Sequence, residues 1–207
     1  REAWQILFED VFVQVPRTLG ILPGYRPKLG DNYNKRTSNE YDNATLLRVW
    51  ELLLEVPSCD RDAFEIDVIM TGRQLLGNYF LDVKKEFDGF YKKRNVPGLK
   101  EKASEMREIL SDLELLNSFH NRASLDKWIE DARSLGDTEE LKNYYEKNAR
   151  NLITTWGGSL NDYASRTWAG LLNDYYAKRW EIYFDAVIGA AEKGIELNKD
   201  ELKSRLA

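Results

Sequence analysis

Few residues of this chain have the type and spacing that nucleophilic, hydrolytic or metal chemistry requires. The sequence has a single histidine, His120, and a single cysteine, Cys59. Any Ser-His-Asp or Cys-His triad would need His120 as its base, but a polar stretch typical of a helix end surrounds it, which favours a structural role. Cys59 follows Pro57 in a predicted turn without a neighbouring base. One cysteine and one histidine also exclude a multi-cysteine zinc site and an internal disulfide. We therefore expect no catalytic residue, metal or cofactor here.

Carboxylates are plentiful, and glycoside hydrolysis uses a pair of them. The sequence has 35 Asp and Glu residues. Glu130 and Asp131 are candidates, but Lys127 precedes them at helical ion-pair spacing. No acidic pair stands out by apolar surroundings, and neither GxxxxGK[ST] nor GxGxxG occurs.

The densest local signal is a tryptophan followed by two glycines, Trp156, Gly157 and Gly158, where two predicted helices meet. A tryptophan at a glycine-rich junction can stack on the apolar face of a sugar ring. The alternative is that Trp156 buries its ring and closes the end of a helix bundle.

The elements that must position this junction are helices. Apolar residues repeat at helical spacing through most of the chain. Trp4, Leu7, Phe8, Val11 and Phe12 form one apolar stripe, and Pro16 ends that segment. Residues 16–42 are predicted to form a long loop, either functional or an ordinary surface excursion. Further helices are predicted from Asn43 to Pro57, over 62–92, from Leu99 to Leu113, from Ser124 to Leu135, after Asp137, and from Asn161 to Lys193.

Several details of these helices follow from residue type. Gly72 and Gly77 are expected to allow a close helix crossing. Asn43, Ser124 and Asp137 are predicted N-caps, and Gly136 a C′ residue. Residues 1–194 are predicted to form one helical domain. Residues 195–207 are a charged tail that frays or forms a short helix.

Composition sets the outer limits. The 207 residues are 43% hydrophobic and 12% aromatic, which argues against disorder. A net charge of −5 argues against nucleic-acid binding, and no apolar run reaches membrane-spanning length. We predict an all-α fold, an irregular bundle of about six to eight helices. The chain starts at Arg1 without a signal-like leader, so we expect a piece of a longer protein.

Four stretches resemble one enzyme family. AWQILFEDVF (3–12), WIEDAR (128–133), NARNLITTWG (148–157) and LNDYASRTWAGLLNDYYAKRW (160–180) are similar to the C-terminal helical domain of α-N-acetylglucosaminidases, glycoside hydrolase family eighty-nine. The last two stretches are the specific ones, and the helices between them are generic.

The resemblance implies a fragment of a multidomain enzyme that removes terminal α-linked N-acetylglucosamine from glycans with net retention. It implies two catalytic glutamates in an upstream (β/α) barrel and a helical domain that packs on this barrel and lines the cleft. Trp156, Leu160 and Tyr163 match the cleft-lining positions, although the loop joining them looks shorter than in some relatives. The implied partners are the barrel and the glycan. The implied compartment is secreted or periplasmic for a bacterial protein and lysosomal for a eukaryotic one.

Two other interpretations remain open. One is a free-standing helical interaction module without activity, favoured by the missing triads and phosphate loops. The other is a self-contained enzyme that uses helix carboxylates such as Glu130, which would need a buried acidic partner.

Overall fold

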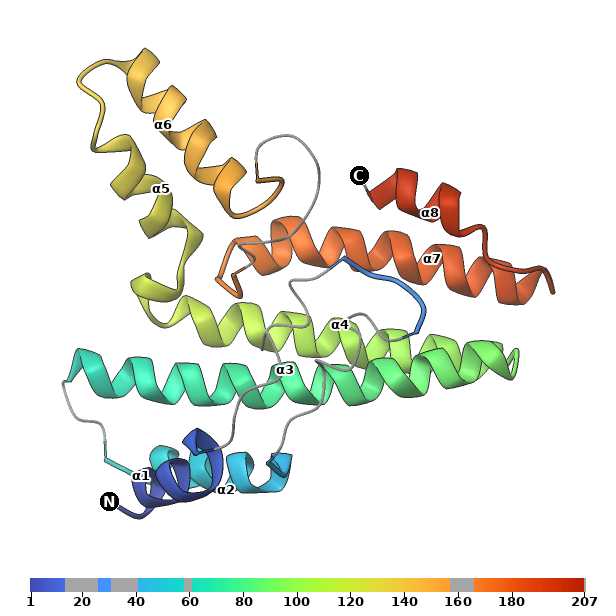
Figure 1. The fold of residues 1–207 in the computed structure, drawn as a ribbon, viewed down its shortest axis with the longest axis horizontal. Helices are drawn as coiled ribbons and strands as arrows, with labels where there is room; N and C mark the ends of the chain where they lie inside the picture. The colour runs from blue at the N-terminus through green and yellow to red at the C-terminus, as the bar shows by residue number, and fades with distance from the viewer. Residues whose placement is uncertain (14–25, 31–40, 58–60, 157–165, 207) are drawn as a thin grey trace.

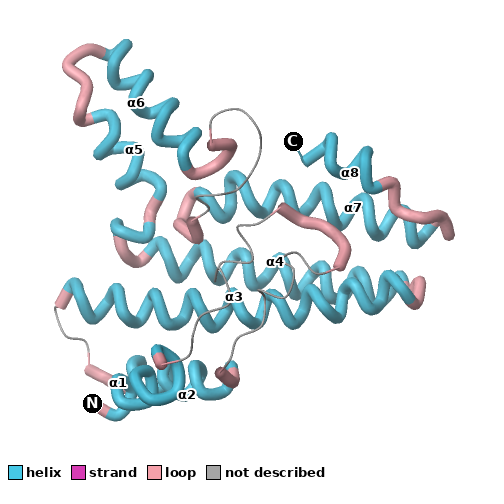
Figure 2. Tube along the Cα trace, in the orientation of Figure 1, coloured by secondary structure: helices cyan, strands magenta, loops and turns pink. Residues whose placement is uncertain are grey.

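A computed structural model of the chain describes residues 1–13, 26–30, 41–57, 61–156 and 166–206. Within these ranges the chain is all-α, as predicted, and lacks β-strands (Figure 2). The eight α-helices are α1 (Glu2–Ile6), α2 (Asn43–Leu54), α3 (Asp62–Lys92), α4 (Val96–Ser118), α5 (Leu125–Arg133), α6 (Glu139–Leu152), α7 (Lys178–Glu192) and α8 (Lys199–Leu206). Two π-helical segments, η1 (Leu7–Phe12) and η4 (Leu172–Ala177), extend α1 and precede α7, and a 3₁₀ turn, η3 (Asn121–Ala123), precedes α5.

The long helices α3 and α4 form the centre of the molecule (Figure 1). The predicted helix over 62–92 has the observed bounds of α3. Asn95 caps α4 by accepting a hydrogen bond from the Gly98 N–H at 3.1 Å. The predicted stripe on α4 is confirmed, since Leu99, Ala103, Met106, Leu110 and Leu113 are all buried.

Helix α7 packs against α3 and α4 through aromatic rings. Trp180 meets Phe80 of α3 edge to face, with ring centroids 4.9 Å apart. Phe184 of α7 lies 5.6 Å from Phe87. Such pairs contribute about 0.5–1.5 kcal/mol beyond the area they bury. At the surface, Arg107 of α4 binds both carboxylate oxygens of Glu181 of α7, at 2.6 and 2.7 Å.

Helices α1 and α2 cover the opposite side of α3 and have their own small core. The expected close crossing is confirmed at Gly72, where a Cβ atom would come within 2.6 Å of the Trp50 ring. The predicted stripe on the first segment is wrong in part. Leu7 is buried, but Trp4, Phe8 and Phe12 are exposed. Ala3 and Leu7 face α2 instead, because residues four apart lie on one face of a helix and this face, not that of Trp4 and Phe8, meets α2.

Other boundaries also differ from the sequence-based expectation. The N-caps are Asp42 and Thr138, each one residue away from the predicted Asn43 and Asp137. Leu135 is exposed rather than inward. Gly136 does not adopt a positive φ. It allows a close approach instead, because a Cβ there would lie 2.6 Å from the Lys142 nitrogen.

The last predicted helix begins later than expected. Residues 166–168 are not helical, and Ala169 forms an isolated bridge to Ser124. The helical part starts near Leu171, and α7 ends at Glu192. The charged tail forms the short helix α8, which lies against α7 and buries Leu202 and Leu206. Among the described helices, none has the length and apolarity needed to cross a bilayer.

Candidate functional site

Trp156 lies just beyond the end of α6 in an unusual backbone conformation. Its φ is +52°, a left-handed value that bulky residues rarely adopt. Its backbone N–H donates to the Asn151 carbonyl at 2.7 Å, and the Thr154 hydroxyl donates to the Arg150 carbonyl at 2.7 Å. The Trp156 side chain is 45% exposed. Backbone strain of this kind costs about 1–3 kcal/mol and clusters at functional sites.

Residues 166–170 bring the chain back on the other side of this junction. Leu125 N–H donates to the Ala169 carbonyl, and Ala169 N–H donates to the Ala123 carbonyl, both at 2.9 Å. Gly170, with φ +84°, donates its N–H to Glu114 of α4 at 2.6 Å. The other Glu114 carboxylate oxygen accepts from Asn173 N–H at 3.2 Å. Glu114 therefore provides hydrogen-bond acceptors for the backbone N–H groups at the start of η4.

Two tryptophans join these parts. The rings of Trp128 on α5 and Trp168 lie with centroids 5.8 Å apart. Trp128 Nε1–H also donates to the Ala149 carbonyl of α6 at 3.0 Å. Helix α5, helix α6 and residues 166–170 are therefore held together, and Trp156 follows closely after α6.

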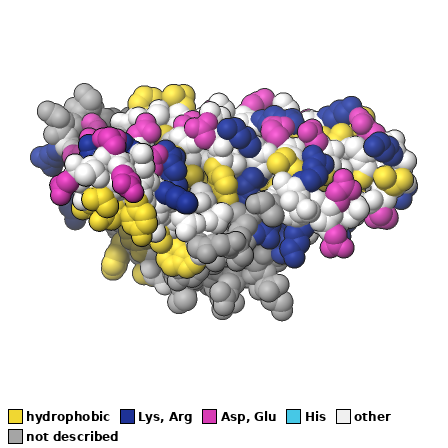
Figure 3. Space-filling model, turned by 90° about the horizontal axis from the view of Figure 1, so that it is seen from above, with side chains coloured by type: hydrophobic (Ala, Val, Ile, Leu, Met, Phe, Trp, Pro, Cys, Tyr) yellow, Lys and Arg dark blue, Asp and Glu magenta, His cyan; other side chains and the backbone are white. Residues whose placement is uncertain are grey.

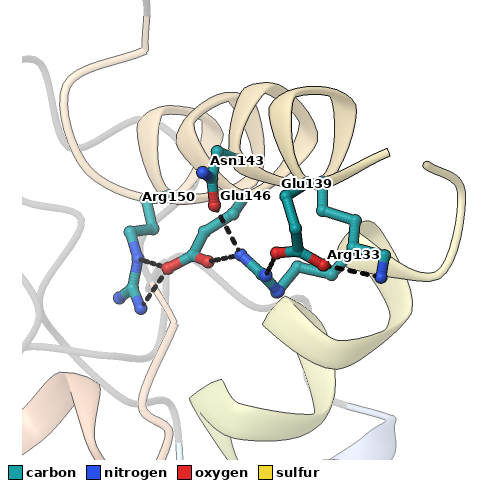
Figure 4. A network of polar contacts seen from close by, with 6 residues as sticks. Arg133, Glu139, Asn143, Glu146 and Arg150 are labelled. Atoms are coloured by element: carbon teal, nitrogen blue, oxygen red, sulfur yellow. Dashed lines mark hydrogen bonds and ion pairs between the residues drawn. The ribbon is translucent and has the colours of Figure 1, made fainter. Parts of the chain in front are cut away.

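A surface network fastens α6 to α5 along the hairpin that carries Trp156 (Figure 4). Arg133 of α5 binds Glu146 at 2.8 Å, Asn143 at 2.9 Å and Glu139 at 2.9 Å. Arg150 adds a second bond to Glu146 at 2.9 Å. Arg150 first, and then Arg133, lower the pKa of Glu146. The Glu146 carboxylate is held as an ion by two arginines, which suits a scaffold rather than an acid catalyst.

The view from above shows the character of the surface (Figure 3). Hydrophobic side chains form several separate groups on this face, among charges of both signs. An apolar groove of about 430 Å³ lies elsewhere, between α2, α3 and the end of α4. Trp50, Leu54, Phe64, Val68 and Phe119 are among the residues that line it. A sugar needs several converging polar groups, and Glu65 is the single charged residue among those lining the groove. The groove is therefore a poor glycan site.

The whole of this chain, residues 1–207, matches the family model described as the alpha-N-acetylglucosaminidase (NAGLU) C-terminal domain. The chain belongs to this family. Human alpha-N-acetylglucosaminidase is 29% identical over 181 residues, a match covering 85% of this chain and 24% of the human protein.

Solved structures of the family have the same fold. The enzyme CpGH89 from Clostridium perfringens, in complex with its substrate GlcNAc-alpha-1,4-galactose, matches with a TM-score of 0.86 and 26% identity over 97% of this chain. The family 89 glycoside hydrolase from the same organism in complex with PUGNAc also has a TM-score of 0.86 and 26% identity, over 99% of this chain. In both, the match covers 25% of that chain, so this chain spans about a quarter of the length of its relatives.

Of the predicted site residues, Trp156 is described, and Leu160 and Tyr163 lie outside the described residues, as does Cys59. His120 is buried and structural. Its Nδ1 accepts from Arg122 N–H at 3.1 Å, so Nε2 carries the proton and donates to Asp62 at 2.7 Å. Asp131 and Glu130 pair with Lys127, as the ion-pair interpretation predicted. No group of three metal-binding side chains occurs in the part of the chain that the structure describes.

Sequence reasoning missed two polar features. Arg73 of α3 donates to the Thr167 carbonyl at 3.3 Å, and burial, followed by the charge of Arg166, lowers the pKa of Arg73. Lys84 and Asp88 form a buried ion pair at 2.6 Å. Their signal was present, because Lys84 and Asp88 continue the spacing of four from the core residue Phe80.

Proposed function

We propose that this chain is the accessory helical domain of a retaining α-N-acetylglucosaminidase. In this proposal it packs on a (β/α) catalytic barrel in the same polypeptide, and Trp156, Leu160 and Tyr163 line the cleft for terminal α-linked N-acetylglucosamine. Catalysis belongs to two barrel carboxylates. A retaining mechanism places them about 5–5.5 Å apart, one as nucleophile and one as acid/base.

The observation that carries the proposal is the state of Trp156 in a chain of this family. The ring is neither buried nor left on a loose terminus, since the surrounding helices are pinned by Trp128, Glu114 and Arg133. An aromatic side chain that is 45% exposed suits stacking against a pyranose ring. A strained backbone conformation is typical of a functional site, where the strained geometry is kept because the function needs it.

The experiment compares Trp156→Gly and Trp156→Ala with wild type in the full-length protein, using an aryl α-N-acetylglucosaminide. Glycine adopts φ near +52° without steric cost, so Trp156→Gly removes the ring without leaving strain behind. We expect both variants to lose at least about tenfold in kcat/KM, which corresponds to about 1.4 kcal/mol. The melting temperature of Trp156→Gly should match or exceed that of wild type.

Tyr144→Ala is the matched control, because Tyr144 is an exposed aromatic residue on α6 well before the junction. It should retain kcat/KM. Unchanged activity in both Trp156 variants would remove Trp156 from the cleft. An inactive wild type would contradict the proposed activity itself and favour a binding module.

A further inference from the structure

The first helical segment is apolar on two sides. Ala3 and Leu7 are buried against α2, and Ile6 and Val11 pack partly against the same cluster. On the outer side Trp4 is 46% exposed, Phe8 67%, Phe12 62% and Val13 55%. We call Trp4, Phe8, Phe12 and Val13 the outer face of α1–η1.

This outer face is unusual for an exposed helix. A surface helix normally turns one apolar face toward the core and a polar face toward solvent. Scattered exposed apolar residues are common, but here three aromatic rings follow one another at a spacing of four residues. Half of each ring, at about 150–250 Å² per aromatic side chain, adds up to roughly 300 Å². Patches of this size mark interaction sites on otherwise soluble surfaces.

The polar residues of the segment leave the outer face free. Glu2 pairs with Arg48 of α2 at 3.4 Å, and Gln5 donates to Glu9 at 3.1 Å. Both contacts lie along the helix or toward α2, so they form a rim and do not cover the rings. Such a polar rim around an apolar centre is the usual anatomy of a protein interface.

The relatives of this chain contain a much longer polypeptide. The matching family is a C-terminal domain, and the chain spans about a quarter of the length of its relatives. The remaining polypeptide of such an enzyme therefore lies mainly before this domain, and α1 is the first helix of the chain. Figure 1 places α1 at the outside of the molecule, with α2 beside it.

We propose that the outer face of α1–η1 is the surface on which the preceding polypeptide of the same enzyme packs. This inference rests on the proposed function, since it takes the chain as the C-terminal part of a longer glycosidase. The interface is intramolecular, so it buries Trp4, Phe8 and Phe12 in a monomer. This interface accounts for three aromatic side chains that lie outside the core of the domain.

The test measures solvent access at this face in the full-length protein. Phe8→Cys and the smaller change Val13→Cys are labelled with a maleimide, and labelling at each site is quantified by peptide mapping. Ile195→Cys is the matched control, because Ile195 is an apolar residue of similar exposure, 56%, in the loop before α8. For each variant, the labelling rate of the native protein is expressed as a fraction of its labelling rate in denaturant.

We expect Phe8→Cys and Val13→Cys to label at least tenfold more slowly than Ile195→Cys in a monomeric sample. Labelling at the rate of the control would overturn the proposal. Protection that appears only in dimers or larger oligomers would also overturn it and assign the face to a second copy. Hydrolysis of the aryl substrate by the same samples tests the proposed function separately, so each idea can fail alone.

Discussion

At the scale of single residues, the chain buries an ion pair to hold one glycine. Lys84 Nζ lies 2.6 Å from Asp88 and donates to the Gly30 carbonyl at 2.7 Å. Asp88 accepts from Gly30 N–H and from the Tyr183 hydroxyl, both at 2.9 Å. Burying two charges is costly unless further hydrogen bonds satisfy them. Here each charge has such bonds, and residues 26–30 are thereby fixed to α3 and α7.

Tyr183 makes this cluster sensitive to alkaline pH. Burial first, and then the charge of Asp88, raise the pKa of Tyr183 well above its ordinary value of 10. The folded state therefore keeps the phenol neutral, while the unfolded chain ionises near pH 10. The stability that results is complete below pH 10 and is lost as pH rises toward the folded pKa.

We predict that Tyr183→Phe lowers the free energy of unfolding by about 1–3 kcal/mol at neutral pH, because Asp88 loses a buried donor. The difference from wild type should stay constant up to about pH 10 and shrink as the pH rises above that value. Urea unfolding at several pH values measures this, with the exposed Tyr144→Phe as control. Parallel pH profiles for wild type and Tyr183→Phe would contradict the proposed role of the phenol.

At the scale of elements, periodicity predicted the long helices and missed the local geometry that tertiary contacts decide. The apolar residues of α3 and α4 keep a regular helical spacing over many turns. The two helices can therefore be predicted even when an end is misplaced by one residue. Asp42 and Asn43 are equally good caps by type, and sequence alone does not separate them. The region before Leu171 has a helical pattern, but its backbone pairs with Ser124 and Leu125 instead.

Gly72 and Gly89 of α3 test the helix crossing, because they share a helix and differ in surroundings. A Cβ at Gly72 would meet the Trp50 ring at 2.6 Å, and that ring is fixed by an Nε1–H bond to the Val68 carbonyl at 3.1 Å. A Cβ at Gly89 would meet nothing within 4 Å. We expect Gly72→Ala to destabilise by about 1–3 kcal/mol, since overpacking outweighs helix propensity.

Gly89→Ala should instead stabilise the protein by up to about 1 kcal/mol, because alanine is the better helix former. The two urea midpoints should therefore shift in opposite directions from wild type. Equal shifts of the same sign would show that Trp50 does not limit the approach of α2 to α3.

At the scale of the whole molecule, one part of the candidate site could be predicted and another could not. A tryptophan before two glycines indicated a junction between helices and left open whether the ring is exposed or buried; the structure has an exposed Trp156 just beyond α6. Its left-handed backbone could not be predicted, because glycine, not tryptophan, is the residue expected there. The outer face of α1–η1 was also missed. An amphipathic pattern predicts one apolar face that points toward the core, whereas this segment is apolar on two sides.

The proposed function leads to a prediction for residues 1–207 expressed by themselves. The described carboxylates with resolved partners serve structure, as Asp88, Glu114 and Glu146 do at α3, η4 and the α5–α6 hairpin. A retaining glycosidase needs two carboxyl groups about 5–5.5 Å apart in one cleft, and the resemblance places both in the preceding barrel. We therefore expect residues 1–207 alone to give a helical circular dichroism spectrum and no hydrolysis of an aryl α-N-acetylglucosaminide. The full-length protein, assayed alongside, should be active. Turnover by the isolated chain at a comparable rate would mean that the catalytic carboxylates lie within these 207 residues.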